Sequence, residues 1–116
     1  MNILNNRNQR NLNSNNCPSM VANNTLPTGA FQDDDWSVTL TDYNNAYHYY
    51  GYNNRTGDSL SLTGAEVKGD SNRRVYIWRN GQYRYEVSWQ PKDSNFVRLQ
   101  VFDPANKLIL NRLLAK

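Results

Sequence analysis

The sequence contains one imidazole and one thiol, those of His48 and Cys17, so most nucleophilic and metal-dependent chemistries lack their components. A Ser or Cys nucleophile needs a base held beside it, and a zinc site needs several His or Cys ligands. His48 lies between Tyr47 and Tyr49, without a G-x-S-x-G motif, and we interpret it as a strand residue on a polar face. Cys17 completes no CxxC motif, and we interpret it as an unpaired thiol. The sequence therefore predicts no catalytic residue, no metal site and no cofactor.

The ten Asp and Glu residues leave one enzyme class open. Two carboxylates that meet in the fold can act as acid and base, as in a glycosidase, and we keep a carboxylate-pair enzyme as a minor hypothesis. Three consecutive Asp at residues 33–35 lack the alternating oxygen ligands and the Gly of an EF-hand loop. We expect them to form a solvated approach to the first strand.

Arginine and tyrosine are the two residue types that indicate binding. Nine Arg stand against four Lys, and the planar guanidinium group pairs with phosphate or carboxylate and stacks on aromatic rings. Strand alternation places Tyr47 and Tyr49 on one face and Tyr50 and Tyr52 on the other, so these rings cannot all share one core. Our candidate binding residues combine exposed rings with nearby guanidinium groups: Tyr50, Tyr52, Arg79 and Arg84.

Short strands must position these side chains, because alternating apolar and polar positions recur from Trp36 onward between Gly, Asn, Asp and Pro. Seven candidate strands follow one another, at residues 36–41, 46–52, 59–63, 74–79, 82–89, 96–102 and 107–113. We expect an all-β fold, an antiparallel meander that closes as a small barrel or folds over as a sandwich. An open sheet would instead leave two long edges unpaired.

The clearest turn is Asn80-Gly81, because both residues tolerate the positive φ angles of a two-residue type I′ hairpin. This turn would place Arg79 opposite Gln82. One aromatic face would then contain Tyr76, Trp78, Tyr83, Tyr85, Val87 and Trp89. Further turns are expected at Asn44-Asn45 and at residues 103–106, where Pro occupies the second position.

The first 35 residues differ from the rest of the chain in composition. Ten Asn occur among the first thirty residues, with few apolar residues and no regular period. Such a segment cannot bury enough apolar surface to offset its ordering entropy. We therefore expect residues 1–35 to form a flexible Asn-rich arm and residues 36–116 to form a single antiparallel β domain.

Runs of consecutive apolar residues bear on the compartment of the protein and on its association with membranes. No run approaches the roughly 20 apolar residues of a membrane-spanning helix. The N-terminus also lacks the apolar segment of a secretory signal, which predicts a cytoplasmic protein if Met1 is native. If a leader has been removed before Met1, the protein would instead be exported.

Four segments, at residues 56–64, 73–78, 89–91 and 110–114, resemble small uncharacterised β-rich proteins of cyanobacteria. The resemblance extends from about residue 36 to the C-terminus. No activity is established for that group, so the resemblance assigns no catalytic or binding residue to this chain.

The sequence thus favours a non-enzymatic domain that binds another macromolecule, with a protein as the first choice of partner. Exposed rings beside Arg can also stack on bases or sugars, so nucleic-acid or carbohydrate binding on the aromatic and Arg-bearing sheet face is the alternative. The net charge is only +3, and Arg84 and Glu86 alternate along one strand. Interspersed charge favours a protein contact over a continuous phosphate track.

Overall fold

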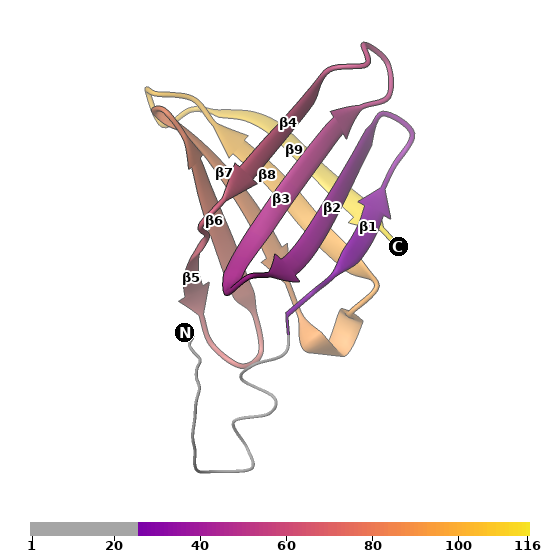
Figure 1. Ribbon diagram of the computed structural model, residues 1–116, viewed down its shortest axis with the longest axis vertical. Helices are drawn as coiled ribbons and strands as arrows, with labels where there is room; N and C mark the ends of the chain where they lie inside the picture. The colour runs from indigo at the N-terminus through magenta and orange to yellow at the C-terminus, as the bar shows by residue number, and fades with distance from the viewer. Residues whose placement is uncertain (1–25) are drawn as a thin grey trace.

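The computed structural model describes residues 26–116, which form nine antiparallel strands and one short 3-10 turn (Figure 1). The all-β antiparallel meander is therefore confirmed, with nine strands instead of seven. The elements are β1 (Gly29–Gln32), β2 (Trp36–Tyr43), β3 (Ala46–Asn53), β4 (Ser59–Thr63), β5 (Glu66–Gly69), β6 (Arg74–Asn80), β7 (Tyr83–Trp89), η1 (Pro91–Asp93), β8 (Phe96–Phe102) and β9 (Leu108–Ala115). The predictions for residues 1–25, including the thiol of Cys17, lie outside the described residues.

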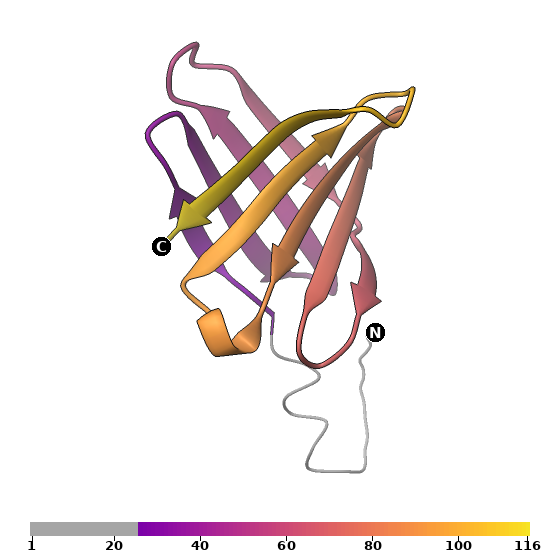
Figure 2. The same cartoon turned by 180° about the vertical axis from the view of Figure 1, so that it is seen from behind.

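All nine strands belong to one sheet, in the order β4-β3-β2-β1-β9-β8-β7-β6-β5. Strands that follow one another in sequence are paired, except for β4 and β5, and β1 also pairs with β9 through Gln32 and Ala115. The sheet curls into a half-barrel (Figures 1 and 2). We call β1–β4 the front wall and β5–β9 the rear wall.

The half-barrel remains open between β4 and β5, although they are neighbours in sequence. β4 pairs with β3 and β5 pairs with β6, so the chain passes from the front wall to the rear wall at residues 64–65. Gly64 has a φ of +84°, a conformation that L side chains rarely adopt, and this permits the change of partner. The sequence did not predict β5, because Val67 is the only large apolar residue of this strand.

β1 corrects the domain boundary that we expected at residue 35. Its four residues pair with β2, from Gly29 opposite Leu40 to Gln32 opposite Ser37, and Phe31 is completely buried. A segment of four residues with one buried apolar side chain shows no clear period of two, so its composition resembled that of the arm. The β domain therefore includes Gly29 and the residues that follow it.

Residues of the connection between β1 and β2 form ion pairs with β9 and so stabilise the contact between β1 and β9. Arg112 of β9 donates from Nη1 to Asp33 Oδ2 at 3.0 Å and from Nη2 to Asp35 Oδ2 at 2.8 Å. Asp33 Oδ1 also accepts the backbone N–H groups of Asp35 and Trp36. Of the three consecutive acids only Asp34 is exposed, so the expected solvated approach is wrong for the other two.

The β6–β7 hairpin has a register that differs by two residues from the predicted one. Asn80 pairs with Tyr83 and Arg79 pairs with Arg84, so the loop is Gly81-Gln82. Gly81 takes the positive φ of +61° at the first loop position, and Asn80 stays in the strand. A shift of two residues keeps each side chain on the same face of the sheet. The predicted aromatic face is therefore preserved, and it points into the half-barrel.

Aromatic side chains fill much of the interior. Tyr47 and Tyr49 of β3 meet Tyr76 and Trp78 of β6, with ring centroids 4.9 to 5.4 Å apart. Trp78 Nε1 donates a 3.0 Å hydrogen bond to the carbonyl oxygen of Tyr47. The Tyr47 hydroxyl donates to the carbonyl oxygen of Pro27. The ring contacts and the hydrogen bond from Trp78 join the front and rear walls where strand pairing does not.

Three local predictions are confirmed. Asn44 and Asn45 both have positive φ angles, of +53° and +61°, and they turn β2 into β3. The β8–β9 connection is the expected turn, in which the Asp103 carboxylate accepts two backbone N–H groups. The C-terminal run is a strand, β9, as expected.

Candidate functional site

The four predicted binding residues lie on the outer surface of the sheet, in two separate places. Tyr50 and Tyr52 are two residues apart on β3, with 44% and 38% of their area exposed. Arg79 and Arg84 face each other across β6 and β7. β3 lies between β2 and β4 in the front wall, whereas β6 and β7 are neighbours in the rear wall. The two Tyr residues are therefore close to each other, as are the two Arg residues, but the Tyr and the Arg lie on different walls.

The two Arg side chains are already engaged within the rear wall. Arg79 Nη2 lies 3.1 Å from Glu66 Oε1, and Arg84 Nε lies 2.5 Å from Glu86 Oε2. Arg84 also donates from Nη1 to Asn106 Oδ1 at 2.8 Å and lies 4.1 Å from the centre of the Phe102 ring. A ligand that used these guanidinium groups would have to compete with the existing partners.

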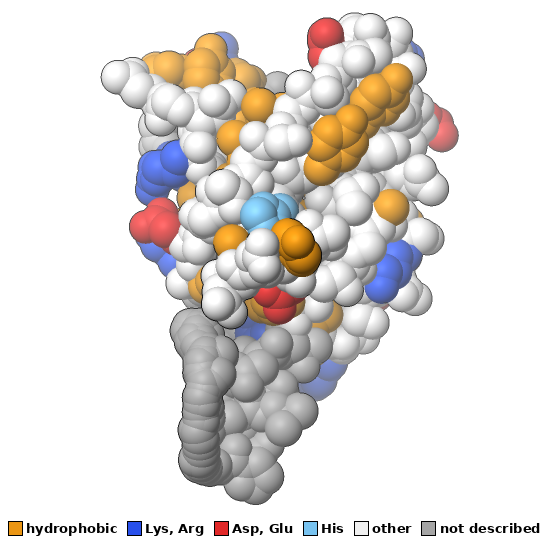
Figure 3. Space-filling model, viewed as in Figure 1, with side chains coloured by type: hydrophobic (Ala, Val, Ile, Leu, Met, Phe, Trp, Pro, Cys, Tyr) orange, Lys and Arg blue, Asp and Glu red, His pale blue; other side chains and the backbone are white. Residues whose placement is uncertain are grey.

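Tyr50 and Tyr52 belong to a face that carries hydroxyl groups and rings but no Asp, Glu, Lys or Arg. Cross-strand pairing forms three rows over β2, β3 and β4, each with an aromatic ring between two hydroxyl side chains: Ser37, Tyr52 and Ser59; Thr39, Tyr50 and Ser61; Thr41, His48 and Thr63. Figure 3 looks onto this front wall, which is mainly white and orange, with the histidine near its centre. We call these nine residues the tyrosine face.

His48 has a local structural setting within the tyrosine face. Its Nε2 lies 3.1 Å from the carbonyl oxygen of Tyr43, and its ring centroid lies 6.3 Å from that of Tyr43. Tyr43 itself is 66% exposed at the end of β2. The imidazole is therefore an outward strand side chain that contacts a backbone group and a ring.

A cleft opens at one end of the half-barrel, between the two walls. Its volume is about 350 Å³. The apolar and aromatic part of its lining comes from both walls: Trp36, Tyr49, Gly51 and Leu60 from the front, and Tyr85, Val101, Ile109 and Leu110 from the rear. Asn53, Asp58 and Ser59 add polar groups from the β3–β4 connection and its ends. We call this cavity the end cleft.

The position of Tyr49 in the end cleft depends on Gly51. A Cβ atom at residue 51 would lie 2.7 Å from the Tyr49 hydroxyl oxygen and 2.9 Å from its Cε1 atom, so only glycine leaves room for this ring. The Tyr85 ring centroid lies 5.6 Å from that of Tyr49. Burial raises the pKa of the Tyr49 hydroxyl, which therefore remains a protonated donor at neutral pH.

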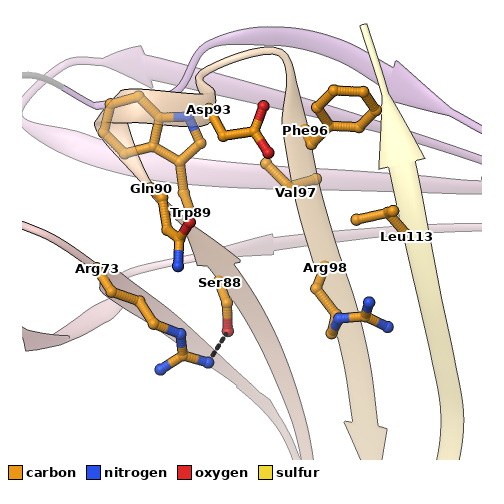
Figure 4. Close-up of a pocket in the computed structure, with 9 residues that line it drawn as sticks. All are labelled: Arg73, Ser88, Trp89, Gln90, Asp93, Phe96, Val97, Arg98 and Leu113. Carbon is orange, nitrogen blue, oxygen red and sulfur yellow. Dashed lines mark hydrogen bonds between the residues drawn. The ribbon is translucent and has the colours of Figure 1, made fainter.

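A second pocket, of about 170 Å³, lies beside η1 (Figure 4). Arg73 Nη2 donates to Ser88 Oγ at 3.1 Å, and Arg98 Nη1 donates to Asn111 Oδ1 at 2.9 Å. Asp93 lines the same pocket and offsets part of the positive charge. Ligand pockets typically have volumes of about 300 to 1,000 Å³. The end cleft falls within that range, whereas this pocket is too small for most organic ligands.

Residues 26–116 contain no group of three or more His, Cys, Asp or Glu side chains that could hold a metal ion. Within the same described residues, no helix has the length and apolar character needed to cross a membrane.

Comparisons with protein-family models, with curated proteins and with solved structures found no match to this chain. The candidate sites therefore rest on geometry. The sequence did not predict the end cleft, because strands far apart in the chain contribute its lining. Its local signal was the alternation in residues 59–63, which places Leu60 and Leu62 on the inner face.

Proposed function

We propose that this is a non-enzymatic binding domain that recognises a protein partner through the tyrosine face, with Tyr50 and Tyr52 as the main contacts. The observation that carries the proposal is the exposure of two large rings on a face without Asp, Glu, Lys or Arg. The centres of protein interfaces are depleted in charge and enriched in aromatic side chains. Tyrosine among small hydroxyl side chains is also typical of the antigen-binding loops of antibodies, where the rings supply contact area at a low entropic cost.

Arg79 and Arg84 have a secondary role in this proposal. Both guanidinium groups are paired with carboxylates on the rear wall, so a partner would gain little new charge pairing from them. The tyrosine face, by contrast, offers two rings whose exposed area a partner can cover without breaking an ion pair.

Carbohydrate binding is the second candidate, because each ring of the tyrosine face lies between two hydroxyl side chains. A sugar presents an apolar face for stacking and hydroxyl groups for hydrogen bonds. Nucleic-acid binding has less support on this face, since phosphate contacts need Lys or Arg and the three rows contain neither.

The test compares a double variant of the tyrosine face with a matched variant of the rear wall. Tyr50→Ser with Tyr52→Ser removes both rings, and Arg79→Gln with Arg84→Gln removes both charges from the rear-wall pair. Proteins captured from the native cells are quantified by mass spectrometry and then purified for measurement of Kd. We expect a partner that binds the wild type and the Arg variant, and that binds the Tyr variant at least about tenfold more weakly. A partner retained equally by all three proteins would contradict the proposal.

Two further measurements separate the other ligand classes. A glycan array that detects binding by the wild type and by the Arg variant, but not by the Tyr variant, would favour carbohydrate over protein. Binding of a single-stranded oligonucleotide with an affinity that falls steeply with salt would favour nucleic acid, because released counterions produce that dependence.

A further inference from the structure

We propose that the end cleft is a separate ligand site, for a small, planar and mainly apolar molecule that carries one hydrogen-bond acceptor such as a carbonyl oxygen. The cleft lies on the inner side of the sheet, whereas the tyrosine face lies on the outer side. Among the residues named for the two sites only Ser59 belongs to both, so variants at the other positions test the sites independently of each other.

The shape and lining of the cleft favour a flat apolar occupant. Aromatic rings line both of its sides, Trp36 and Tyr49 on the front wall and Tyr85 on the rear wall, and Leu60 and Leu110 add aliphatic surface. Rings stack favourably in offset or edge-to-face geometry, so a planar molecule between the walls can contact several of them. The volume of about 350 Å³ suits an occupant of one or two fused rings with a short substituent.

Two phenol groups select for a hydrogen-bond acceptor. Within the described residues, neither the Tyr49 hydroxyl nor the Tyr85 hydroxyl has a hydrogen-bond partner. A donor in an apolar cavity gains from an acceptor and loses when it is covered by an apolar group alone. An acceptor on the ligand would satisfy one or both hydroxyls.

The charge of the lining selects against anions. Asp58 is the one charged side chain among the lining residues of the end cleft, and its Oδ2 accepts a 2.9 Å hydrogen bond from Thr56 Oγ1. No Lys or Arg lines the cleft to balance a carboxylate or a phosphate on the ligand. We therefore expect a ligand that carries no negative charge.

The experiment uses two neutral fluorescent naphthalenes that differ in their acceptor. Prodan carries a ketone, and N-phenyl-1-naphthylamine carries no carbonyl group. Titration of the full chain should show saturable binding of both probes with one site per molecule. Leu60→Trp and Leu110→Trp each place an indole in the cleft and should weaken both probes at least tenfold. Tyr50→Phe, on the outer face, should leave both affinities within twofold.

The hydroxyl groups are tested by conservative variants that retain the rings. Tyr85→Phe, alone and with Tyr49→Phe, should weaken Prodan about three- to tenfold, which is the worth of a neutral hydrogen bond. The same variants should leave the affinity for N-phenyl-1-naphthylamine unchanged or raise it, because no hydroxyl is then covered by an apolar group alone. Equal losses for both probes would overturn the role of the acceptor. Binding that does not saturate, or that neither Trp variant weakens while circular dichroism shows a folded protein, would overturn the site itself. None of these outcomes depends on whether the tyrosine face binds a protein.

Discussion

The two walls of the half-barrel bury the same kind of side chain and present different chemistry to solvent. Along β1–β4 every outward strand position is free of Asp, Glu, Lys and Arg. Figure 2 shows the strands of the rear wall from outside. The outward positions of these strands include six charged side chains: Glu66, Lys68, Arg79, Arg84, Glu86 and Arg98. Packing constrains the inward positions of both walls, but it does not require the outward positions to differ. The contrast therefore points to a difference in what the two outer faces contact.

The largest predicted effect is a loss of stability that should occur for a variant of the interior and not for a variant of the tyrosine face. Trp78→Ala removes a completely buried indole that packs on Tyr47 and Tyr49 and donates to the Tyr47 carbonyl. We expect the free energy of unfolding to fall by about 3–5 kcal/mol. Urea denaturation followed by circular dichroism measures this change. The matched control, Tyr50→Ala on the outer face, should lower the free energy of unfolding by about 1 kcal/mol or less. Equal losses at the two positions would contradict the distinction between a packed interior and an exposed tyrosine face.

A smaller effect is expected where the front wall borders the end cleft. Gly51→Ala places a Cβ atom 2.7 Å from the Tyr49 hydroxyl oxygen, so the ring must move. Such overpacking costs about 1–3 kcal/mol. The same substitution in a Tyr49→Leu background should cost much less, because the clashing ring is absent. A cost that persists in that background would show that the contact with Tyr49 is not its cause.

Most of the fold could be predicted because local chemistry and strand period agreed. Two consecutive Asn residues, Asn44 and Asn45, fixed the turn between β2 and β3, and alternation assigned the aromatic side chains of β6 and β7 to the correct face. The register of that hairpin was wrong because Asn80 and Gly81 suit two alternative turns, and alternation does not distinguish them. β1 and β5 were missed because each has four residues and one large apolar side chain.

The candidate sites were less predictable, since they depend on how the sheet curls. Alternation predicted that Tyr50 and Tyr52 share a face opposite to that of Tyr49. It could not show that Arg79 and Arg84 would lie on the other wall. Which residues share a wall is set by the closure of β1 on β9 and by the change of partner at residues 64–65. These contacts leave no local pattern in the sequence.

The β1–β9 closure should respond to acid. Burial opposes ionisation of Asp33, but the N–H groups of Asp35 and Trp36, together with Arg112, hold its pKa below the ordinary value of 3.8. Hydrogen bonds from Arg55 and Arg112 likewise hold the pKa of Asp35 below 3.8. A carboxyl group whose pKa is lowered by folding stabilises the protein above its unfolded pKa, and this stabilisation is lost as the pH falls through the folded value.

Arg112→Met tests this closure. The variant should have a lower Tm than the wild type at pH 7, and the difference should shrink as the pH falls below about 3.8. Thermal melts from pH 7 to pH 2 measure the change. Arg98→Met removes an outward guanidinium that pairs with Asn111 rather than a carboxylate, so its smaller effect should not vary in this range. A constant difference for Arg112→Met would mean that the variant acts through packing instead of charge.

The smallest predicted difference lies within the rear wall, between two ion pairs of unequal exposure. The side chains of Arg79 and Glu66 are 57% and 55% exposed, whereas those of Arg84 and Glu86 are 24% and 19% exposed. Double-mutant cycles should give a coupling of about 0.2–0.5 kcal/mol for the first pair and about 1 kcal/mol for the second. Sodium chloride at high concentration should reduce the first coupling more, because solvent screens it more effectively.

The size of these couplings bears on the contrast between the walls. If both are close to zero, the rear-wall charges contribute solubility rather than stability, and the front wall could have carried the same charges without harm to the fold. Their absence from the tyrosine face would then favour binding more strongly, since neither packing nor stability would account for it. A coupling of several kcal/mol would reverse that argument, because charge on the rear wall would then be explained by the fold alone.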